Sequence, residues 1–303
     1  MTTATKAALV CLLALGCEAD EPSAPTIDVK SRGQRVQPKA SATTNEVAPA
    51  EPVTVSRLVA DGTYWRIKTA HGPVHVWVPK GYKRKRAETV VYVHGFYTHV
   101  DQAWSDHHLP AQFAASAINA MFIACEAPAN GQEPVSWASI DELLKAVEAG
   151  IGKKVPRKRL VAVGHSGAWR TLIDWLDEPI LDTVVLFDAA YGELDSYKKW
   201  ITASDKHRLI DVGDNTRKWT EELHKDLAES VVLEGFPPAD QPVPKALRRA
   251  RIVYIRSNVG HFPLVTGGVA LPLTLRMLRA KQLLHMPLAD LLEATDDSDP
   301  GDE

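Results

Sequence analysis

The sequence predicts an α/β protein whose central sheet is mostly parallel, with helices on both faces and an antiparallel hairpin at its start. Short, continuously apolar segments rich in β-branched residues recur along the chain, and such segments are typical of buried parallel strands. Segments with helical spacing separate them, and this alternation is typical of α/β folds. The hydrophobic share of 45% and the charged share of 24% are those of an ordinary globular protein.

The hairpin is predicted at residues 63–67 and 74–78, which alternate between apolar and polar around the turn-forming His71, Gly72 and Pro73. Buried strands are expected at residues 89–93, 120–124, 160–163, 183–187, 208–210 and 252–255. Helices are expected at residues 109–118, 141–149, 169–176 and 218–228, the second with Ser139 as its candidate N-cap.

Residues 1–17 have the features of an export signal. Lys6 precedes an apolar run over residues 7–15 that is too short to span a bilayer but suits a signal-peptide core. The run ends at Ala14-Leu15-Gly16-Cys17, which resembles a bacterial lipoprotein box with alanine in place of the usual leucine. The resemblance implies a lipid on Cys17 and an anchor in the cell membrane or outer membrane. A plain secretory signal, giving a secreted or periplasmic protein, is the alternative.

The remaining chain divides into three parts. Residues 18–52 are rich in Ala, Pro, Ser, Thr and Glu and nearly lack large apolar residues, which predicts a disordered tether. Residues 53–292 are expected to form one domain, and residues 293–303 a disordered acidic tail. A net charge of −3 gives no reason to expect a nucleic-acid partner. Cys125 follows an apolar run and should be buried, and the chain has neither a disulfide framework nor zinc-ligand spacing.

Ser166 is the strongest candidate for a reactive residue. It stands in Gly164-His165-Ser166-Gly167, between the apolar residues 160–163 and an amphipathic helical stretch. A serine on a sharp strand-to-helix turn is the layout of a nucleophile elbow, where the helix N-terminus favours developing negative charge. The alternative is an ordinary turn in which the serine caps the helix.

A serine hydroxyl is a weak nucleophile at neutral pH and needs a general base. His261 follows the last predicted strand in a loop flanked by Gly260 and Pro263, where it could reach Ser166. The histidines at 94, 99, 107 and 108 lie upstream, outside the chain order serine, acid, histidine that such sites use. A structural loop histidine is the alternative.

Three aspartates compete to orient His261. Asp188 follows the strand after the elbow unit, whereas Asp211 and Asp214 flank Val212-Gly213 near the end of the next strand. Asp214 could instead cap the helix that begins near Thr216. Asp188 is favoured, with Asp211 and Asp214 left open.

An oxyanion hole requires two backbone N–H groups near the nucleophile. One is expected from Gly167 and the other from the turn that follows residues 89–93, where Phe96 is favoured over Tyr97 as the donor. A turn without a ligand is the alternative. Asp101, His107, His108 and Glu126 could line a pocket, but their spacing does not fit a metal site. No metal or cofactor is expected.

These motifs together resemble the α/β-hydrolase fold over about residues 64–286. The chain departs from the usual elbow pattern at Ala168, which stands in place of the final glycine. The resemblance implies a serine hydrolase that cleaves a small-molecule ester, or an amide, through an acyl-enzyme. It also implies an acid near Asp211 or Asp214 in most members and near Asp188 in some lipase-like ones. A non-catalytic envelope lipoprotein that uses the scaffold for binding is the rival hypothesis.

Overall fold

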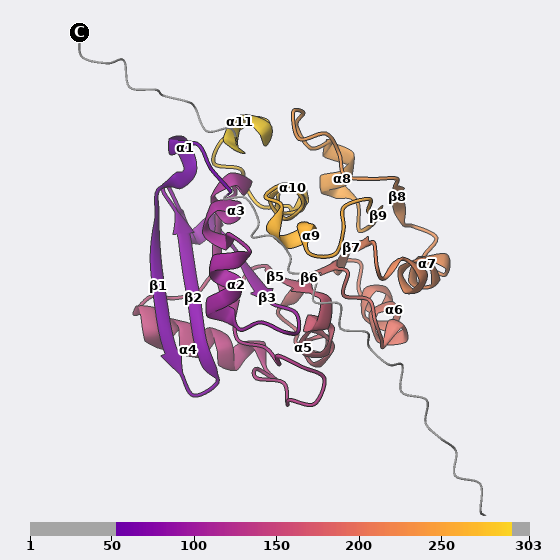
Figure 1. The fold of residues 1–303 in the computed structure, drawn as a ribbon, viewed down its shortest axis with the longest axis horizontal. Coiled ribbons are helices and arrows are strands. Elements are labelled where there is room, and N and C mark those ends of the chain that lie inside the picture. The colour runs from indigo at the N-terminus through magenta and orange to yellow at the C-terminus, as the bar shows by residue number, and fades with distance from the viewer. Residues whose placement is uncertain (1–52, 293–303) are drawn as a thin grey trace, which may run out of the picture. The chain divides into compact units, whose positions relative to one another are not determined.

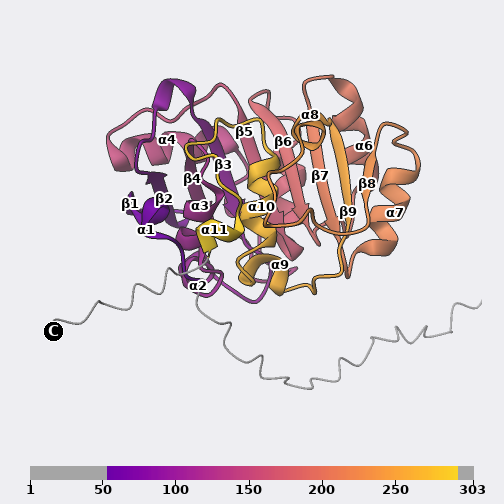
Figure 2. The same cartoon turned by 90° about the horizontal axis from the view of Figure 1, so that it is seen from above.

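The structure is a computed structural model that describes residues 53–292. The predicted signal with Cys17, the tether and the acidic tail lie outside the described residues. The described residues form one nine-stranded sheet in the order β1-β2-β4-β3-β5-β6-β7-β9-β8 (Figures 1 and 2). The strands are β1 Gly62–Thr69, β2 Gly72–Pro79, β3 Glu88–Val93, β4 Ala120–Cys125, β5 Leu160–His165, β6 Leu181–Phe187, β7 Arg208–Gly213, β8 Val231–Leu233 and β9 Ile252–Arg256.

Helices precede, connect and follow these strands. The α-helices are α1 Arg57–Ala60, α2 Val100–Asp106, α3 Leu109–Ser116, α4 Ile140–Ile151, α5 Trp169–Trp175, α6 Leu194–Ala203, α7 Arg217–Lys225, α8 Lys245–Arg249, α9 Pro263–Thr266, α10 Ala270–Met277 and α11 Ala289–Leu292. Two 3-10 helices, η1 Arg84–Arg86 and η2 Ser166–Ala168, lie next to β3 and β5. Within the described residues, no helix has the length and apolar character needed to cross a membrane.

The strand pairing confirms the predicted fold class. β1 and β2 form an antiparallel hairpin, and β2 pairs antiparallel with β4. Every other pairing, from β4 across to β8, is parallel. The parallel strands therefore have their carboxyl ends at one edge of the sheet, the edge where active sites gather in open α/β sheets.

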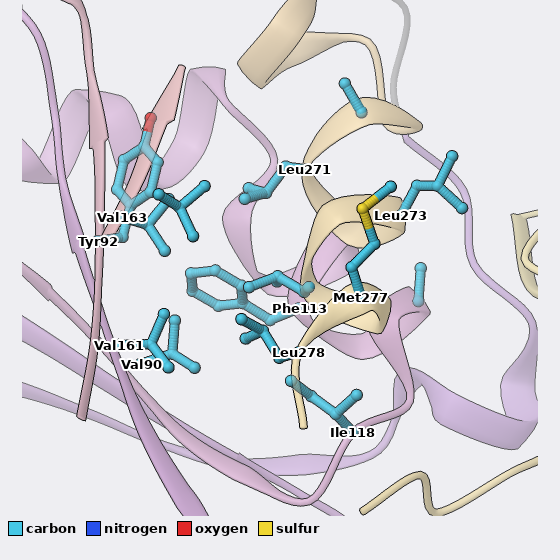
Figure 3. Close-up of a cluster of buried hydrophobic side chains, with 14 of the residues drawn as sticks. Val90, Tyr92, Phe113, Ile118, Val161, Val163, Leu271, Leu273, Met277 and Leu278 are labelled. Atoms are coloured by element: carbon cyan, nitrogen blue, oxygen red, sulfur yellow. The ribbon is translucent and has the colours of Figure 1, made fainter. Parts of the chain in front are cut away.

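Helices cover both faces of the sheet (Figure 2). Successive strand residues point to opposite faces, so Val90 and Tyr92 pack in the cluster that includes α3 and α10, whereas Val91 and Val93 pack in the one that includes α4, α5 and α6. Figure 3 shows the first cluster, in which the Phe113 ring lies between strand side chains and the helix that carries Leu271 and Met277. The two cores hold β3 and β5 rigidly, and both strands lead into the site.

The sequence and the structure differ in local detail. The helix predicted at residues 109–118 ends at Ser116, because Ala117 has a left-handed backbone (φ 51°) and its N–H bonds to Ala114. Ser139 precedes α4, but its hydroxyl donates to Glu178 at 2.6 Å instead of capping the helix. Cys125 is buried, as expected.

Candidate active site

Ser166 occupies a tight turn between a strand and a helix. β5 ends at His165, and the chain turns through η2 directly into α5. Ser166 has a φ of 52°, a left-handed conformation that is strained for any residue with a side chain. The turn needs small neighbours, since a Cβ at Gly164 would lie 2.5 Å from Leu172 and 3.0 Å from the Ala168 methyl. The departure at Ala168 is accommodated because its neighbour in space is a glycine.

Phe96 and Gly167, the predicted oxyanion donors, lie side by side. A Cβ at Gly167 would fall 2.3 Å from the Phe96 ring, so only glycine fits against this aromatic side chain. The N–H of Tyr97 donates to the Ala129 carbonyl at 2.8 Å. The N–H of Phe96 has no hydrogen-bond partner among residues 53–292 and is free to donate to a ligand oxygen. The geometry therefore favours Phe96 over Tyr97 as the second donor.

His94 braces the turn that carries Phe96. Its side chain is buried, its Nδ1 lies 2.8 Å from the Gly95 carbonyl oxygen, and its Nε2 lies 2.9 Å from the Glu126 carboxylate and 3.0 Å from the Ala127 nitrogen. Gly95 is needed because a Cβ there would lie 2.8 Å from the Ser166 Cβ. The turn and the serine are thus held within van der Waals contact.

His261 follows β9 and is oriented by Asp188. Its Nδ1 donates to the Asp188 carboxylate at 3.0 Å, which leaves Nε2 available to accept a proton. The Asp188 side chain is fully buried, and its backbone is left-handed, with a φ of 45°. A buried carboxylate at Nδ1 is the arrangement that fixes the tautomer of a catalytic imidazole.

Asp188 also binds the segment that leads into α7. Its carboxylate accepts hydrogen bonds from the backbone N–H groups of Asp214 (2.6 Å), Asn215 (3.2 Å) and Thr216 (3.2 Å). Burial raises the pKa of Asp188, but the hydrogen bonds from His261 and these N–H groups outweigh burial and leave the pKa below its ordinary value. The group is therefore an anion at neutral pH.

The other two candidate acids do not contact His261. Asp211 lies within β7 with its side chain fully buried, and its carboxylate lies 3.3 Å from His224 Nε2. Burial raises the pKa of Asp211. Asp214 reaches the site only through its backbone N–H, which donates to Asp188. Asp214 therefore contributes its backbone N–H to Asp188 and does not cap α7, whose N-cap residue is Thr216.

The Ser166 hydroxyl and the His261 imidazole line the same pocket, but the structure forms no hydrogen bond between them within the described residues. Such bonds are often long before substrate binds. Tyr191 lies beside the serine: burial and the Asp188 charge raise the pKa of Tyr191, and hydrogen bonding to Ser166 opposes that rise. Sequence reasoning missed Tyr191, because nothing in its local pattern indicates that it meets Ser166.

His165 supports the loop that carries His261. It is buried, its Nε2 lies 3.1 Å from the His261 carbonyl oxygen, and the two imidazole centroids are 4.5 Å apart. Burial, together with the neighbouring His261 and His107, lowers the pKa of His165 well below its ordinary value. His165 is thus neutral and donates to that carbonyl.

The pocket in front of Ser166 has a volume of about 690 Å³. The pocket has an aromatic wall formed by Phe96, Tyr97 and Phe262. Phe262 is 50% exposed and Tyr97 is 89% exposed. None of the described residues that line the pocket is lysine or arginine. The pocket therefore offers no lysine or arginine to an anionic ligand, and its aromatic wall suits a ligand with apolar character.

The remaining polar residues singled out in the sequence divide between this pocket and its surroundings. His107 and His108 line the pocket. Burial lowers the pKa of His107 to about 4, and the Tyr92 hydroxyl donates to its Nδ1 at 2.8 Å. Glu126 contacts His94 at 2.9 Å behind the turn, and Asp101 forms an ion pair with Arg66 away from the pocket.

No protein-family profile and no curated protein sequence matches the chain. Solved structures with a similar chain trace include a ferulic acid esterase (11% identity, TM-score 0.49, covering 72% of this chain and 99% of that one). A mutant of the feruloyl esterase module from Clostridium thermocellum complexed with sinapinate has 12% identity and a TM-score of 0.44 over 74% and 94% of the two chains. An esterase from Pyrobaculum calidifontis has 13% identity and a TM-score of 0.43 over 71% and 84%. At such distances these similarities do not bear on activity.

Proposed function

We propose that this protein is a serine hydrolase that cleaves an ester bond through an acyl-enzyme intermediate. The observation that carries the proposal is the hydrogen bond between His261 Nδ1 and the buried Asp188 carboxylate, in a pocket shared with a left-handed Ser166. Together these three residues supply a nucleophile, a general base and an orienting anion.

The proposed reaction uses only groups of this chain and water. Ser166 Oγ attacks the ester carbonyl while His261 Nε2 takes the hydroxyl proton, and the N–H groups of Gly167 and Phe96 stabilise the oxyanion. His261 then gives the proton to the leaving alcohol, which departs and leaves an acyl group on Ser166. A water molecule deprotonated by His261 hydrolyses this acyl-enzyme and regenerates the serine.

The pocket lining supports an acyl or alcohol group without a carboxylate or phosphate, because no lysine or arginine of the described residues lines the pocket and could pair with such an anion. Esters are preferred over amides in this proposal because an alcohol leaves more readily than an amine. We further propose that a lipid on Cys17 anchors the enzyme at the cell envelope. Incorporation of a radiolabelled fatty acid into the wild type but not into Cys17→Ser would support this anchor.

Activity-based labelling tests the proposed function. A fluorophosphonate probe should label the wild type and not Ser166→Ala, and turnover of a short-chain nitrophenyl ester should fall by about 10⁴-fold or more. Ser105 lines the same pocket and is exposed, so Ser105→Ala is the matched control and should keep both signals. Equal labelling of Ser166→Ala and the wild type, or no turnover of any ester by the wild type, would favour the non-catalytic scaffold instead.

A further inference from the structure

A cationic surface lies at the end of the sheet opposite Ser166. It surrounds η1, and loops near the ends of β2 and α4 and after α10 contribute to it. Two adjoining hollows of about 310 Å³ and 660 Å³ mark it, with η1 between them. We call it the basic edge, and its cationic residues are Lys80, Lys83, Arg84, Lys85, Arg86, Lys145, Lys154, Arg157, Lys158 and Lys281.

Only some of these cations are neutralised locally. Lys80 pairs with Asp61, Lys145 and Arg157 share Asp141, and Lys154 pairs with Glu148. The others are exposed and have no acidic partner within the part of the chain that the structure describes; they are Lys83, Arg84, Lys85, Arg86, Lys158 and Lys281. Because the whole chain has a net charge of −3, this edge is a local concentration of positive charge.

Apolar side chains accompany the cations. Leu58 on α1 lines the first hollow and is 61% exposed, although a leucine in an isolated soluble domain would gain free energy by burial. Val59, Leu283 and Leu284 line the same hollow, but Val59 is buried and the two leucines are partly buried. Cations around an exposed leucine match an anionic phospholipid surface, where phosphates meet the cations and the leucine side chain enters the interface. A soluble polyanion would use the cations alone.

We propose that the basic edge docks on the surface of an anionic phospholipid bilayer, with Lys83, Arg86 and Lys281 at the headgroup phosphates and Leu58 in the interface. Arg86 lies just before β3, and Gly95 lies just after it, beside Ser166. A six-residue strand is about 20 Å long. A docked molecule therefore presents the Ser166 pocket to the aqueous phase rather than to the lipid.

Vesicle co-sedimentation tests this docking on the chain from residue 18 onward, so that neither the apolar run at residues 7–15 nor acylation of Cys17 contributes. We expect binding to vesicles of equal parts phosphatidylglycerol and phosphatidylcholine, much weaker binding to phosphatidylcholine alone, and release at high salt. The triple variant Lys83→Gln/Arg86→Gln/Lys281→Gln should bind the anionic vesicles about 100-fold more weakly, since each cation near such a surface contributes about 1 kcal/mol. The residues are exposed, and an unchanged thermal unfolding midpoint would verify the fold.

The matched control removes the same charge elsewhere. Lys199, Lys218 and Lys225 are exposed on α6 and α7, and Lys199→Gln/Lys218→Gln/Lys225→Gln should bind as the parent does. Equal losses in the two triple variants would overturn the proposal, because net charge rather than the basic edge would then explain binding. Equal binding to neutral and anionic vesicles would overturn it too.

Leu58→Gln separates a lipid surface from a soluble polyanion. It should weaken binding to the anionic vesicles and leave binding to dextran sulfate unchanged. An unchanged affinity for vesicles would contradict the proposal and identify the edge as a general polyanion site. Ser166→Ala should bind vesicles normally, so failure of the proposed hydrolysis and failure of docking give different results.

Discussion

Asp188 joins two parts of the molecule through one carboxylate. It accepts the Nδ1–H of His261 and the backbone N–H groups ahead of α7. In many helices the side chain of the N-cap residue accepts a hydrogen bond from an N–H group of the first turn. Here Thr216, the N-cap residue, has no capping bond from its side chain, and its hydroxyl donates to Asp188 at 3.0 Å. Orientation of the imidazole and the start of α7 therefore depend on the same anion.

Substitution of the two buried aspartates distinguishes their roles. Asp188→Asn should lower kcat for a nitrophenyl ester by about 10⁴-fold, because an amide at Nδ1 does not hold the imidazole in the reactive tautomer. Asp211→Asn should keep kcat within a few fold, because the Asp211 carboxylate contacts His224 and not His261. A large loss in Asp211→Asn with normal activity in Asp188→Asn would contradict the assignment of the acid.

Sequence reasoning could place Ser166 and His261 but could not choose among the aspartates. The elbow is a local pattern, in which an apolar run, two glycines and a helical stretch surround the serine within a few residues. The contact between Asp188 and His261 depends on how loops 73 residues apart meet in space. The same holds for Tyr191 beside Ser166 and for the bond from His165 to the His261 carbonyl, because these contacts also join separate parts of the chain.

At the scale of elements, long apolar strands were predictable and short polar helices were not. β3 to β7 and β9 consist mainly of buried residues, so their sequences are continuous apolar runs. α2 has only Val100 and Ala103 buried, and a helix with so narrow an apolar face has little periodic signal. β8 is a largely exposed edge strand of three residues, which is too short to give a recognisable apolar pattern.

The turn after β3 should tolerate no side chain at Gly95. An added Cβ would lie 2.8 Å from the Ser166 Cβ and 3.0 Å from the His165 carbonyl, so Gly95→Ala should separate the turn from the elbow. We expect kcat for the nitrophenyl ester to fall by about 10²-fold or more, the loss typical of a displaced oxyanion donor. Gly131→Ala is the control, because no atom lies within 4 Å of an added Cβ there. Normal turnover by Gly95→Ala would show that this turn does not form the oxyanion hole.

At the scale of the whole molecule, a buried neutral histidine makes stability depend on pH. Burial holds the pKa of His107 at about 4, whereas an unfolded chain has its histidines near 6.5. As the pH falls below about 6.5, His107 binds a proton in the unfolded chain but stays neutral in the folded protein, so the unfolding free energy decreases. Between about pH 7 and about pH 4 this group alone should remove on the order of 3 kcal/mol.

Urea unfolding at the two pH values measures this loss. His107→Gln keeps an acceptor for the Tyr92 hydroxyl but does not titrate, so its unfolding free energy should depend less steeply on pH over the same range. His285→Gln, at an exposed histidine, should keep the slope of the wild type. An identical slope in His107→Gln and the wild type would show that the residue is not held neutral by the fold.

The strained left-handed backbone at Ser166 costs the folded protein stability at the position of the proposed nucleophile. Glycine adopts such a φ without strain, so Ser166→Gly should unfold at a higher temperature than Ser166→Ala, by about 1 kcal/mol in stability. In the proposed mechanism neither variant turns over an ester. A directed-evolution campaign that rewarded heat resistance alone would accordingly select against the serine. Screens on this scaffold therefore have to measure ester turnover in every round, because selection for thermal stability alone would enrich variants without the proposed nucleophile.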